Sequence, residues 1–268
     1  MTPVGAAAAG VFVAGVGALG LVVGSFLTVV VHRVPAGGSV VRPRWACPAC
    51  ASPIRSRDNV PVVSWVLLRG RCRSCAAVVP WRYPCVEAAT GLLFAGLAVL
   101  HGPSAVLPAL LYAGAVGVAL VVIDLDHHRL PDAIVLPSYP VLVALLALAG
   151  ALSGTFPAAR TTLSAGLWLA VYGLIRVATA GRGMGLGDVK LAGVLGLLLG
   201  WLGWGPSVLG LLAGFVVGGV IGLALLATGR VGRGAGIAHG PFMLAGAGLA
   251  VIAGEPVWTA WLGLLGRA

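Results

Sequence analysis

The stretch Ala6–Val31, AAAAGVFVAGVGALGLVVGSFLTVVV, contains no charged residue and decides the fold class. An α-helix needs about 20 apolar residues to cross the roughly 30 Å hydrocarbon core of a bilayer. No basic segment precedes this stretch, and it is longer than the apolar part of a cleaved signal peptide. We therefore expect a retained transmembrane span at this position.

Similar apolar runs recur along the whole chain, which is 59% hydrophobic and 9% charged over 268 residues. Soluble domains carry about 25% charged residues, so this composition excludes a soluble globule, and the apolar surface is too large for a disordered chain. A transmembrane barrel would alternate polar and apolar residues, whereas these runs are continuous. We predict an all-α polytopic membrane protein with about eight transmembrane helices. The further spans are expected at 86–100, 104–123, 133–152, 161–179, 189–203, 206–228 and 241–264.

The distribution of basic residues predicts the orientation. Nine of the 17 Lys and Arg residues lie between Arg33 and Arg82, and loops rich in these residues stay in the cytoplasm. With this segment inside, 15 of the 17 fall on the cytoplasmic face, and Arg160 and Arg267 remain outside. We therefore expect both termini outside. The same rule explains the net charge of +10 without nucleic acid as a partner.

Residues 36–85, called the Cys loop below, carry two CxxC pairs, Cys47–Cys50 and Cys72–Cys75, with 21 residues between them. This spacing is typical of a zinc ribbon, in which four thiolates surround the ion as a tetrahedron. Two disulfides or four unligated thiols are the alternatives, and a cytoplasmic location disfavours disulfides. We predict a structural Zn²⁺ site that stabilises the loop. Cys85 remains outside this set and is expected to be buried as a small apolar residue.

Four of the seven acidic residues lie in two short stretches, IDLDHHRLPD at 123–132 and GMGLGDVK at 183–190. An ionisable side chain at a membrane position costs about 2.5–3.5 kcal/mol, so such residues are candidates for function. The predicted topology places Asp124 and Asp188 at the same depth, near the cytoplasmic surface, on different helices. Two carboxylates that meet can share one proton, and then one activates water while the other polarises a peptide carbonyl. The sequence therefore predicts Asp124 and Asp188 as an aspartic-protease pair.

The residues around these aspartates have supporting or structural interpretations. Gly185 and Gly187 leave the backbone free of side chains, so that an extended substrate segment can approach. Lys190 is expected to extend to the lipid headgroups or to lie beside Asp188. Arg176 is also expected at the headgroups. Asp132 is expected in the first turn of a helix, where a negative charge is favourable.

Taken in order, these residues resemble the bacterial type IV prepilin peptidases, which are intramembrane aspartic proteases of the GxGD class. The resemblance extends over nearly the whole chain. It differs from the usual family pattern at Thr28, where Asn is usual, and at Arg71, where Lys is common. The segments that carry it are Gly24–Pro35, both Cys pairs, Asp58–Pro61, Ser64–Trp65, Leu68–Cys72, Arg82–Pro84, Glu87, Ile123–Asp126, Leu130–Asp132, Gly183–Lys190 and Gly240–Phe242.

The resemblance implies removal of the leader peptide of type IV prepilins or pseudopilins on the cytoplasmic side of the inner membrane. It implies three regions: a first span (1–35), the Cys loop with zinc on its four cysteines (36–85), and a peptidase domain (86–268) containing the two aspartates. It also implies methylation of the new N-terminus with S-adenosylmethionine, for which Gly70 and Arg71 are the candidate cofactor-binding residues. No GxGxxG motif gives separate evidence for that cofactor.

The residues alone leave other functions open. A proton-coupled transporter uses membrane acids as relays, but it predicts an internal repeat that this sequence does not show. A non-catalytic scaffold of a secretion system, organised by zinc, is a second alternative. A presenilin-like GxGD protease also fits Gly185–Asp188, but it gives no role to the Cys loop. Metalloproteases with HExxH and serine hydrolases with GxSxG are not indicated, because neither motif occurs.

Overall fold

The computed structural model describes residues 3–42, 45–230, 232 and 238–266, so that Arg267 lies outside the described residues. In this part of the chain the secondary structure is helical without strands, which confirms the all-α class. The chain divides into two compact units, Met1–Ala119 and Leu120–Ala268. Each unit is described separately below.

The first unit is built on two long helices, α1 (Pro3–Arg33) and α3 (Arg82–His101), with the Cys loop between them. Glycines bring these helices together: a Cβ on Gly20 would lie 2.7 Å from the Thr90 carbonyl oxygen, and one on Gly24 would lie 2.7 Å from Glu87 Cα. Small residues allow helix backbones in membranes to approach closely. This packing places Glu87 against the C-terminal half of α1.

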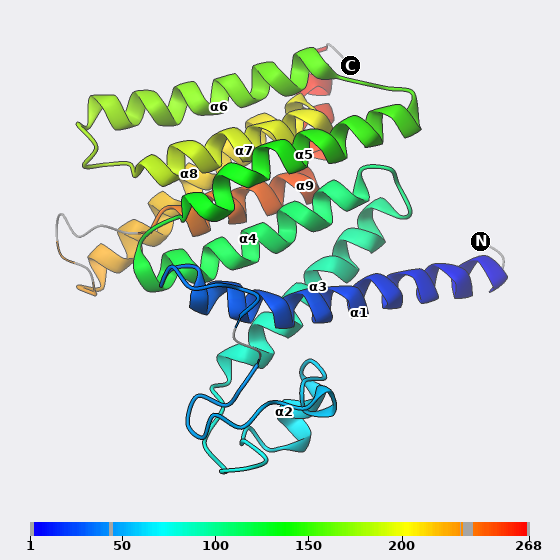
Figure 1. Cartoon of the computed structure of the whole chain (residues 1–268). Helices are drawn as coiled ribbons and strands as arrows, with labels where there is room; N and C mark the ends of the chain where they lie inside the picture. Colours follow the sequence, from blue (N-terminus) through cyan, green and yellow to red (C-terminus); the bar gives the residue numbers. More distant parts are fainter. Residues whose placement is uncertain (1–2, 43–44, 231, 233–237, 267–268) are drawn as a thin grey trace. The chain divides into compact units, whose positions relative to one another are not determined.

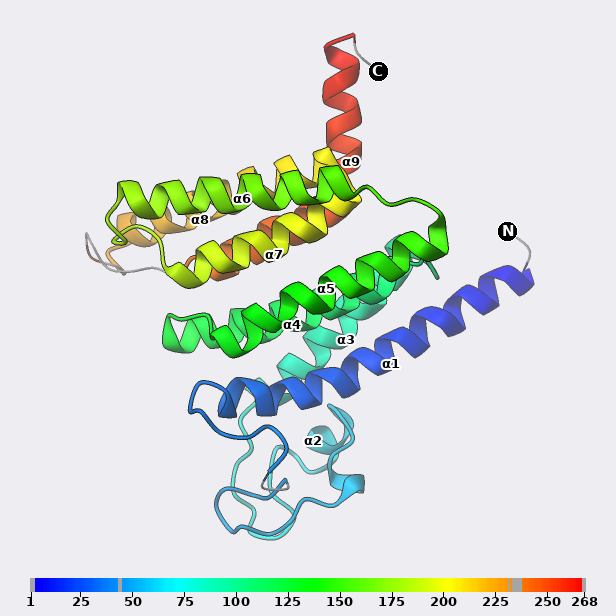
Figure 2. The ribbon, with the colours of Figure 1, turned by 45° about the horizontal axis from the view of Figure 1, so that its top comes forward.

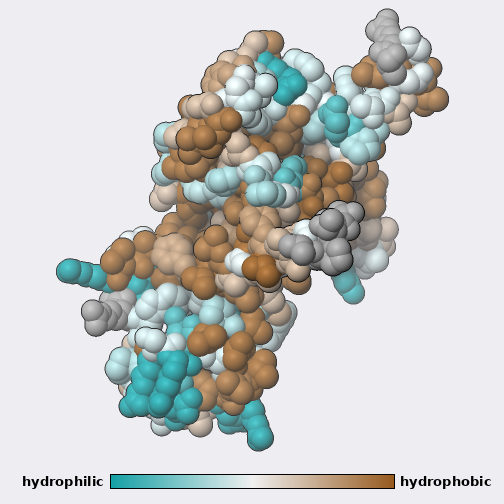
Figure 3. Space-filling view, turned by 90° about the vertical axis from the view of Figure 1, so that its right-hand side faces the viewer, coloured by the Kyte–Doolittle hydropathy of each residue, from teal (hydrophilic) through white to brown (hydrophobic). Residues whose placement is uncertain are grey.

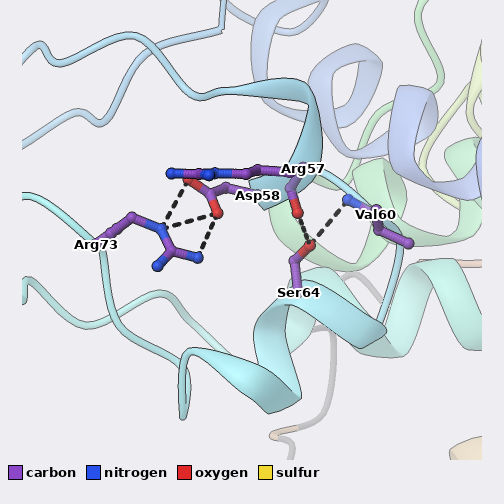
Figure 4. Close-up of polar contacts among 5 residues, drawn as sticks. All are labelled: Arg57, Asp58, Val60, Ser64 and Arg73. Atoms are coloured by element: carbon purple, nitrogen blue, oxygen red, sulfur yellow. Dashed lines mark hydrogen bonds and ion pairs between the residues drawn. The ribbon is translucent and has the colours of Figure 1, made fainter.

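The Cys loop contains two short helices, η1 (Ser56–Asp58) and α2 (Val63–Leu67), joined by polar contacts (Figure 4). Arg73 forms an ion pair with Asp58 at 2.7 Å, and this guanidinium lowers the pKa of the Asp58 carboxyl below its usual value. The Ser64 hydroxyl donates to the Arg57 carbonyl at 3.1 Å and accepts from the Val60 amide at 3.0 Å. These contacts connect η1 to α2 and to the second CxxC pair.

The second unit contains the end of α4 and five further helices, α5 to α9 (Figure 1). Helix α7 is central, because α5, α6, α8 and α9 all pack against it and residues 191–200 are buried without interruption. The C-terminal end of α9 extends beyond the ends of α6 and α7 (Figure 2). The bounds are α4 Leu107–His127, α5 Asp132–Ser153, α6 Ala158–Ala178, α7 Leu186–Leu202, α8 Trp204–Ala227 and α9 Gly240–Leu264.

Each of the eight predicted spans is a helix in the structure. Seven helices in the described part of the chain are long and apolar enough to cross a membrane. The eighth, α7, has 17 residues, which corresponds to a length of about 26 Å. Figure 3 shows hydrophobic side chains over the helices and hydrophilic side chains gathered at the bottom, where Figure 1 places the Cys loop. The structure therefore supports a membrane protein with one large polar insertion.

The two ends of α7 have different partners. At its C-terminal end, Arg160 donates to the carbonyl oxygens of Gly200 at 2.8 Å and of Trp201 at 2.6 Å. A cation at this position complements the free carbonyls and the dipole of the helix. Asp188 lies in the first turn at the opposite end.

Candidate active site

The structure brings both predicted aspartates to one end of the second unit. Asp124 lies in the last turn of α4, and its residue is 4% exposed. Asp188 is the third residue of α7. The two carboxylates are close enough to interact electrostatically. Two carboxylates from different helices can therefore act on one substrate bond, as an aspartic-protease pair requires.

Asp124 is held by the beginning of another helix. The Gly240 amide donates to Asp124 Oδ2 at 3.1 Å, and a Cβ on Gly240 would lie 2.8 Å from that oxygen. Gly240 is the first residue of α9 and Pro241 follows it, which is a typical start of a helix. A helix N-terminus stabilises a carboxylate. A Gly-Pro pair directly before an apolar run, as at Gly240–Pro241, is the sequence signal that indicates this helix start.

Asp188 is held by its own loop. The Gly185 amide donates to Asp188 Oδ2 at 3.0 Å, as in a capping box. A Cβ on Gly187 would lie 2.9 Å from Leu130 Cβ, and a Cβ on Gly240 would lie 3.3 Å from Leu130 Cδ2. Leu130 therefore occupies the space that both glycines leave. The backbone at Gly187, expected to be open to substrate, is covered by this side chain in the structure.

An aromatic cluster that the sequence did not predict lies near Asp188 and the beginning of α9. Tyr172 is fully buried, its ring stacks on Phe215 at a centroid distance of 5.0 Å, and its hydroxyl lies 3.5 Å from His239 Nε2. Tyr172 also interacts electrostatically with Asp188. His239 directly precedes Gly240, so the cluster holds the beginning of α9 in place. No regular spacing connects these residues in the sequence, which is why pattern analysis could not find them.

Two basic residues make contacts that the sequence did not indicate. Lys190 forms an ion pair at 2.7 Å with Asp132, the first residue of α5. Arg176 donates to the Met184 carbonyl oxygen at 3.0 Å. Both contacts hold the segment that carries Asp188. Arg176 fixes the loop before α7, and Lys190 fixes α7 to α5.

The four cysteines of the CxxC pairs come together as predicted. Their Sγ atoms all lie within 4.8 Å of one another, and Cys47 Sγ lies 3.8 Å from Cys75 Sγ. Four thiolates at the Zn–S distance of about 2.3 Å form a tetrahedron with edges of about 3.8 Å. The donor set and its spacing therefore fit a closed metal site. Cys85 is exposed, so its expected burial is wrong.

The two CxxC pairs form turns of the same design. In each turn the first cysteine's amide donates to a carbonyl five residues later, and an isolated bridge flanks the turn. Each turn also passes through an alanine with positive φ, Ala51 at 54° and Ala76 at 57°. The matching bonds are Cys47 N–H to Ser52 O (3.0 Å) and Cys72 N–H to Ala77 O (2.8 Å). The loop therefore presents two equivalent pairs of thiols.

Hydrogen bonds within these turns favour the thiolate form of two of the four cysteines, Cys50 and Cys72. A hydrogen bond with the Ser52 hydroxyl, assisted by the Ser52 amide, lowers the pKa of Cys50 to about 6. The backbone amides of Cys75 and Ser74 lower the pKa of Cys72. Metal ligation by cysteine requires deprotonation, so these hydrogen bonds favour ligation by Cys50 and Cys72.

The positive φ of the two alanines gives a testable prediction. An L-residue in this region is strained by about 1–2 kcal/mol, whereas glycine is not. A metal ion that binds all four thiolates would bind only the folded loop, so Ala76→Gly should tighten the apparent affinity for added Zn²⁺ about fivefold, equivalent to about 1 kcal/mol. Competition with a chelator measures this affinity. Ala49→Gly is the matched control, because Ala49 has no positive φ, and an unchanged affinity in Ala76→Gly would contradict the prediction.

The first unit also contains a pocket of about 470 Å³ between the end of α1, the Cys loop and the beginning of α3. Arg71, one of the two predicted cofactor-binding residues, lines this pocket, as does Thr28. Gly70 has a φ of 65°, and a Cβ there would lie 2.9 Å from the Trp65 ring. Gly70 therefore shapes the turn beside the pocket.

Comparison with known proteins agrees with this organisation. Residues 18–101 match the model of the bacterial peptidase A24 N-terminal domain, and residues 114–223 match that of the type IV leader peptidase family. A prepilin leader peptidase/N-methyltransferase of Burkholderia pseudomallei is 36% identical over 214 residues, covering 68% of this chain and 67% of the relative. The chain belongs to the type IV leader peptidase family. Relatives of the same name from Stutzerimonas stutzeri and Pseudomonas aeruginosa are 37% and 38% identical, each covering 68% of this chain and 71% of the relative.

Family membership confirms the resemblance and the assignment as an enzyme. Together with the apolar helices, it identifies a multi-pass protein of the inner membrane. The transporter and scaffold alternatives find no support in these relatives. No solved structure matches the chain.

Proposed function

We propose that this protein removes the leader peptide of type IV prepilins or pseudopilins with Asp124 and Asp188, and then methylates the new N-terminal amine. The observation that carries the peptidase assignment is the position of the two carboxylates at one end of the second unit, each held by a backbone amide. The relatives named above are prepilin leader peptidases/N-methyltransferases, and this name supports both activities.

The geometry suggests which oxygen atom of each aspartate takes part in the reaction. Gly240 and Gly185 each donate to the Oδ2 atom of an aspartate, so we assign the Oδ1 atoms to the reaction. The ionised carboxylate takes a proton from water, whose oxygen bonds to the scissile carbonyl carbon, while the protonated partner donates to the carbonyl oxygen. The carbon–nitrogen bond then breaks, and the leaving amine takes a proton from the pair.

The orientation of the active site is part of this proposal. We place Asp124, Asp188 and the Cys loop at the cytoplasmic face and both termini outside, because this arrangement puts 15 of the 17 basic residues inside. Lys190 and Arg176 lie at the aspartate end of α7, whereas Arg160 lies at its other end. A precursor anchored in the bilayer by its apolar helix then presents its leader at the level of the aspartates.

The four-cysteine site is assigned to structural Zn²⁺. Thiolate ligands at these distances suit zinc, and a closed site with four protein ligands has no open position for water or substrate. Cys47, Cys50, Cys72 and Cys75 would hold the ion, whose contribution is to stabilise a loop with a small core of its own.

The contact between Gly240 and Asp124 gives a second prediction. Gly240→Ala places a Cβ against Asp124 Oδ2, so the carboxylate must move. Displacement of a catalytic group by about 1 Å can lower the rate about 100-fold, so we expect kcat for leader removal to fall by about 10- to 100-fold. Gly248→Ala is the matched control on the same helix, because a Cβ there meets nothing within 4 Å. Equal kcat values for the two variants would contradict this role of Gly240.

The proposed function is tested by incubating the purified protein with a synthetic prepilin, with and without S-adenosylmethionine, and measuring product masses. Without the methyl donor, the expected product is the precursor shortened by its leader. With the donor, the expected product gains the mass of one methylene group. An uncleaved precursor under both conditions would contradict the peptidase assignment.

A further inference from the structure

We propose that the short helix α2 inserts its outer face into the surface of the lipid bilayer, so that the Cys loop binds phospholipids and prefers anionic ones. This face, called the α2 face below, consists of Val63, Val66 and Leu67, which are 51% to 76% exposed. The contact is separate from both proposed activities, because it uses neither Asp124 nor Asp188.

Helix α2 exposes its apolar side chains and buries its polar one. Residues 63, 66 and 67 have the spacing i, i+3 and i+4, which places them on one side of a helix. Ser64 is buried instead, and its hydroxyl is satisfied by the Arg57 carbonyl and the Val60 amide. A group of large apolar side chains on an otherwise polar surface indicates an interaction site. The α2 face therefore has the properties of a surface that an apolar partner covers.

Two hydrogen bonds fix α2 at the level where α3 begins. The Val62 amide, directly before α2, donates to Glu87 Oε2 at 2.6 Å, and Trp65 Nε1 donates to the Val79 carbonyl oxygen at 3.0 Å. Glu87 is the sixth residue of α3, about 7 Å along the helix axis from the first one. Trp81, directly before α3, is 69% exposed, and tryptophan at the end of a span is typical of the membrane–water interface. The α2 face therefore lies at the depth of this interface.

The position of α2 within the first unit agrees with this depth. Figures 1 and 2 show α2 on the side of the Cys loop toward which α1 runs to its N-terminus. Helix α1 is long and apolar enough to cross a membrane, so this side of the loop is the one nearer the bilayer. Figure 3 shows hydrophobic side chains, in brown, beside the hydrophilic ones in this part of the molecule.

The charge around α2 favours anionic lipids. The Cys loop contains eight arginines and one acid, Asp58, which already forms an ion pair with Arg73. Arg69 and Arg71 follow α2 and are exposed. A basic residue near an anionic membrane surface strengthens binding about fivefold. An anionic phospholipid matches this combination, because its phosphate accepts hydrogen bonds from guanidinium groups and its acyl chains cover the α2 face.

The test uses the photoreactive residue p-benzoylphenylalanine in place of Val66, in the full chain reconstituted into vesicles of phosphatidylcholine and phosphatidylglycerol. The vesicles are irradiated with and without a synthetic prepilin, and mass spectrometry identifies what the probe has bound. Phospholipid adducts are the expected main product. Vesicles of phosphatidylcholine alone should give about fivefold fewer adducts. Leu67→Glu should lower the yield about tenfold, because it replaces an inserted apolar side chain with a charged one.

Val41→Glu is the matched control, because Val41 is also an apolar residue of the Cys loop with an exposure of 76%. It adds the same charge outside α2 and should change the yield of lipid adducts by less than about twofold. Neither Leu67 nor Val41 is buried, so both variants should keep the unfolding temperature of the unaltered protein in detergent.

Three results would overturn the proposal: no lipid adducts at the probe, equal yields from Leu67→Glu and Val41→Glu, or a main product in which the probe joins two copies of the chain or the chain and the prepilin. The last result would show that a protein covers the α2 face. Equal yields in the two kinds of vesicle would contradict the preference for anionic lipids.

Discussion

Replacement of Asp188 by asparagine is expected to lower leader removal by on the order of 10⁴-fold, the scale found when one member of a catalytic group is lost. The amide keeps an oxygen that can accept from the Gly185 amide, so the loop before α7 can keep its conformation. It cannot share a proton with Asp124, so either the base or the acid of the pair is lost. The rate of cleavage of a synthetic precursor, followed by product mass, measures the effect.

The control for this variant is Glu255→Gln, which removes an acid on α9 that the proposed active site does not use. It should cleave at the normal rate. The thermal unfolding temperature of Asp188→Asn in detergent should match that of the unaltered protein, which shows that the variant is folded. Cleavage by Asp188→Asn within tenfold of normal would contradict the assignment.

Loss of the metal site is expected to have the second large effect. Structural zinc contributes apparent binding free energies of about 10–16 kcal/mol in zinc-finger peptides, where it drives folding. Cys47→Ser removes a buried ligand of the four-cysteine site, so we expect loss of the bound ion and unfolding of the Cys loop. Metal analysis and the rate of proteolysis within residues 36–85 measure these changes.

Cys85→Ser separates this effect from a general loss of thiols. Cys85 is exposed and lies outside the four-cysteine group, so this variant should keep its metal and its resistance to proteolysis. Full metal content in Cys47→Ser, or rapid proteolysis of both variants, would contradict the account of the loop.

Much of the fold was predictable, because the requirements of a bilayer act on every residue of a span. The long apolar runs predicted the helices, but their ends were less accurate. Helix α4 continues to His127, beyond the predicted end at 123, so Asp124 lies within its last turn. Helix α7 is short and is surrounded by other helices, which hydropathy alone could not reveal.

The candidate sites were predictable where the chemistry depends on spacing along the chain. Two CxxC pairs and two acids at apolar positions belong to this class. The contacts of Gly240 with Asp124 and of Glu87 with Val62 connect residues far apart in sequence, and only the packing of helices shows them. The ion pair of Lys190 was not predictable for the same reason, since its partner Asp132 lies on a different helix.

The central claim is that Asp124 and Asp188 act as one catalytic unit. It is tested most directly by comparing leader removal by Asp124→Asn, Asp188→Asn and the double variant under identical conditions. Members of one catalytic unit are strongly non-additive, so the account predicts the same residual rate for all three variants. Substantial cleavage by either single variant, or a double variant that is slower than both by the product of the single effects, would contradict it.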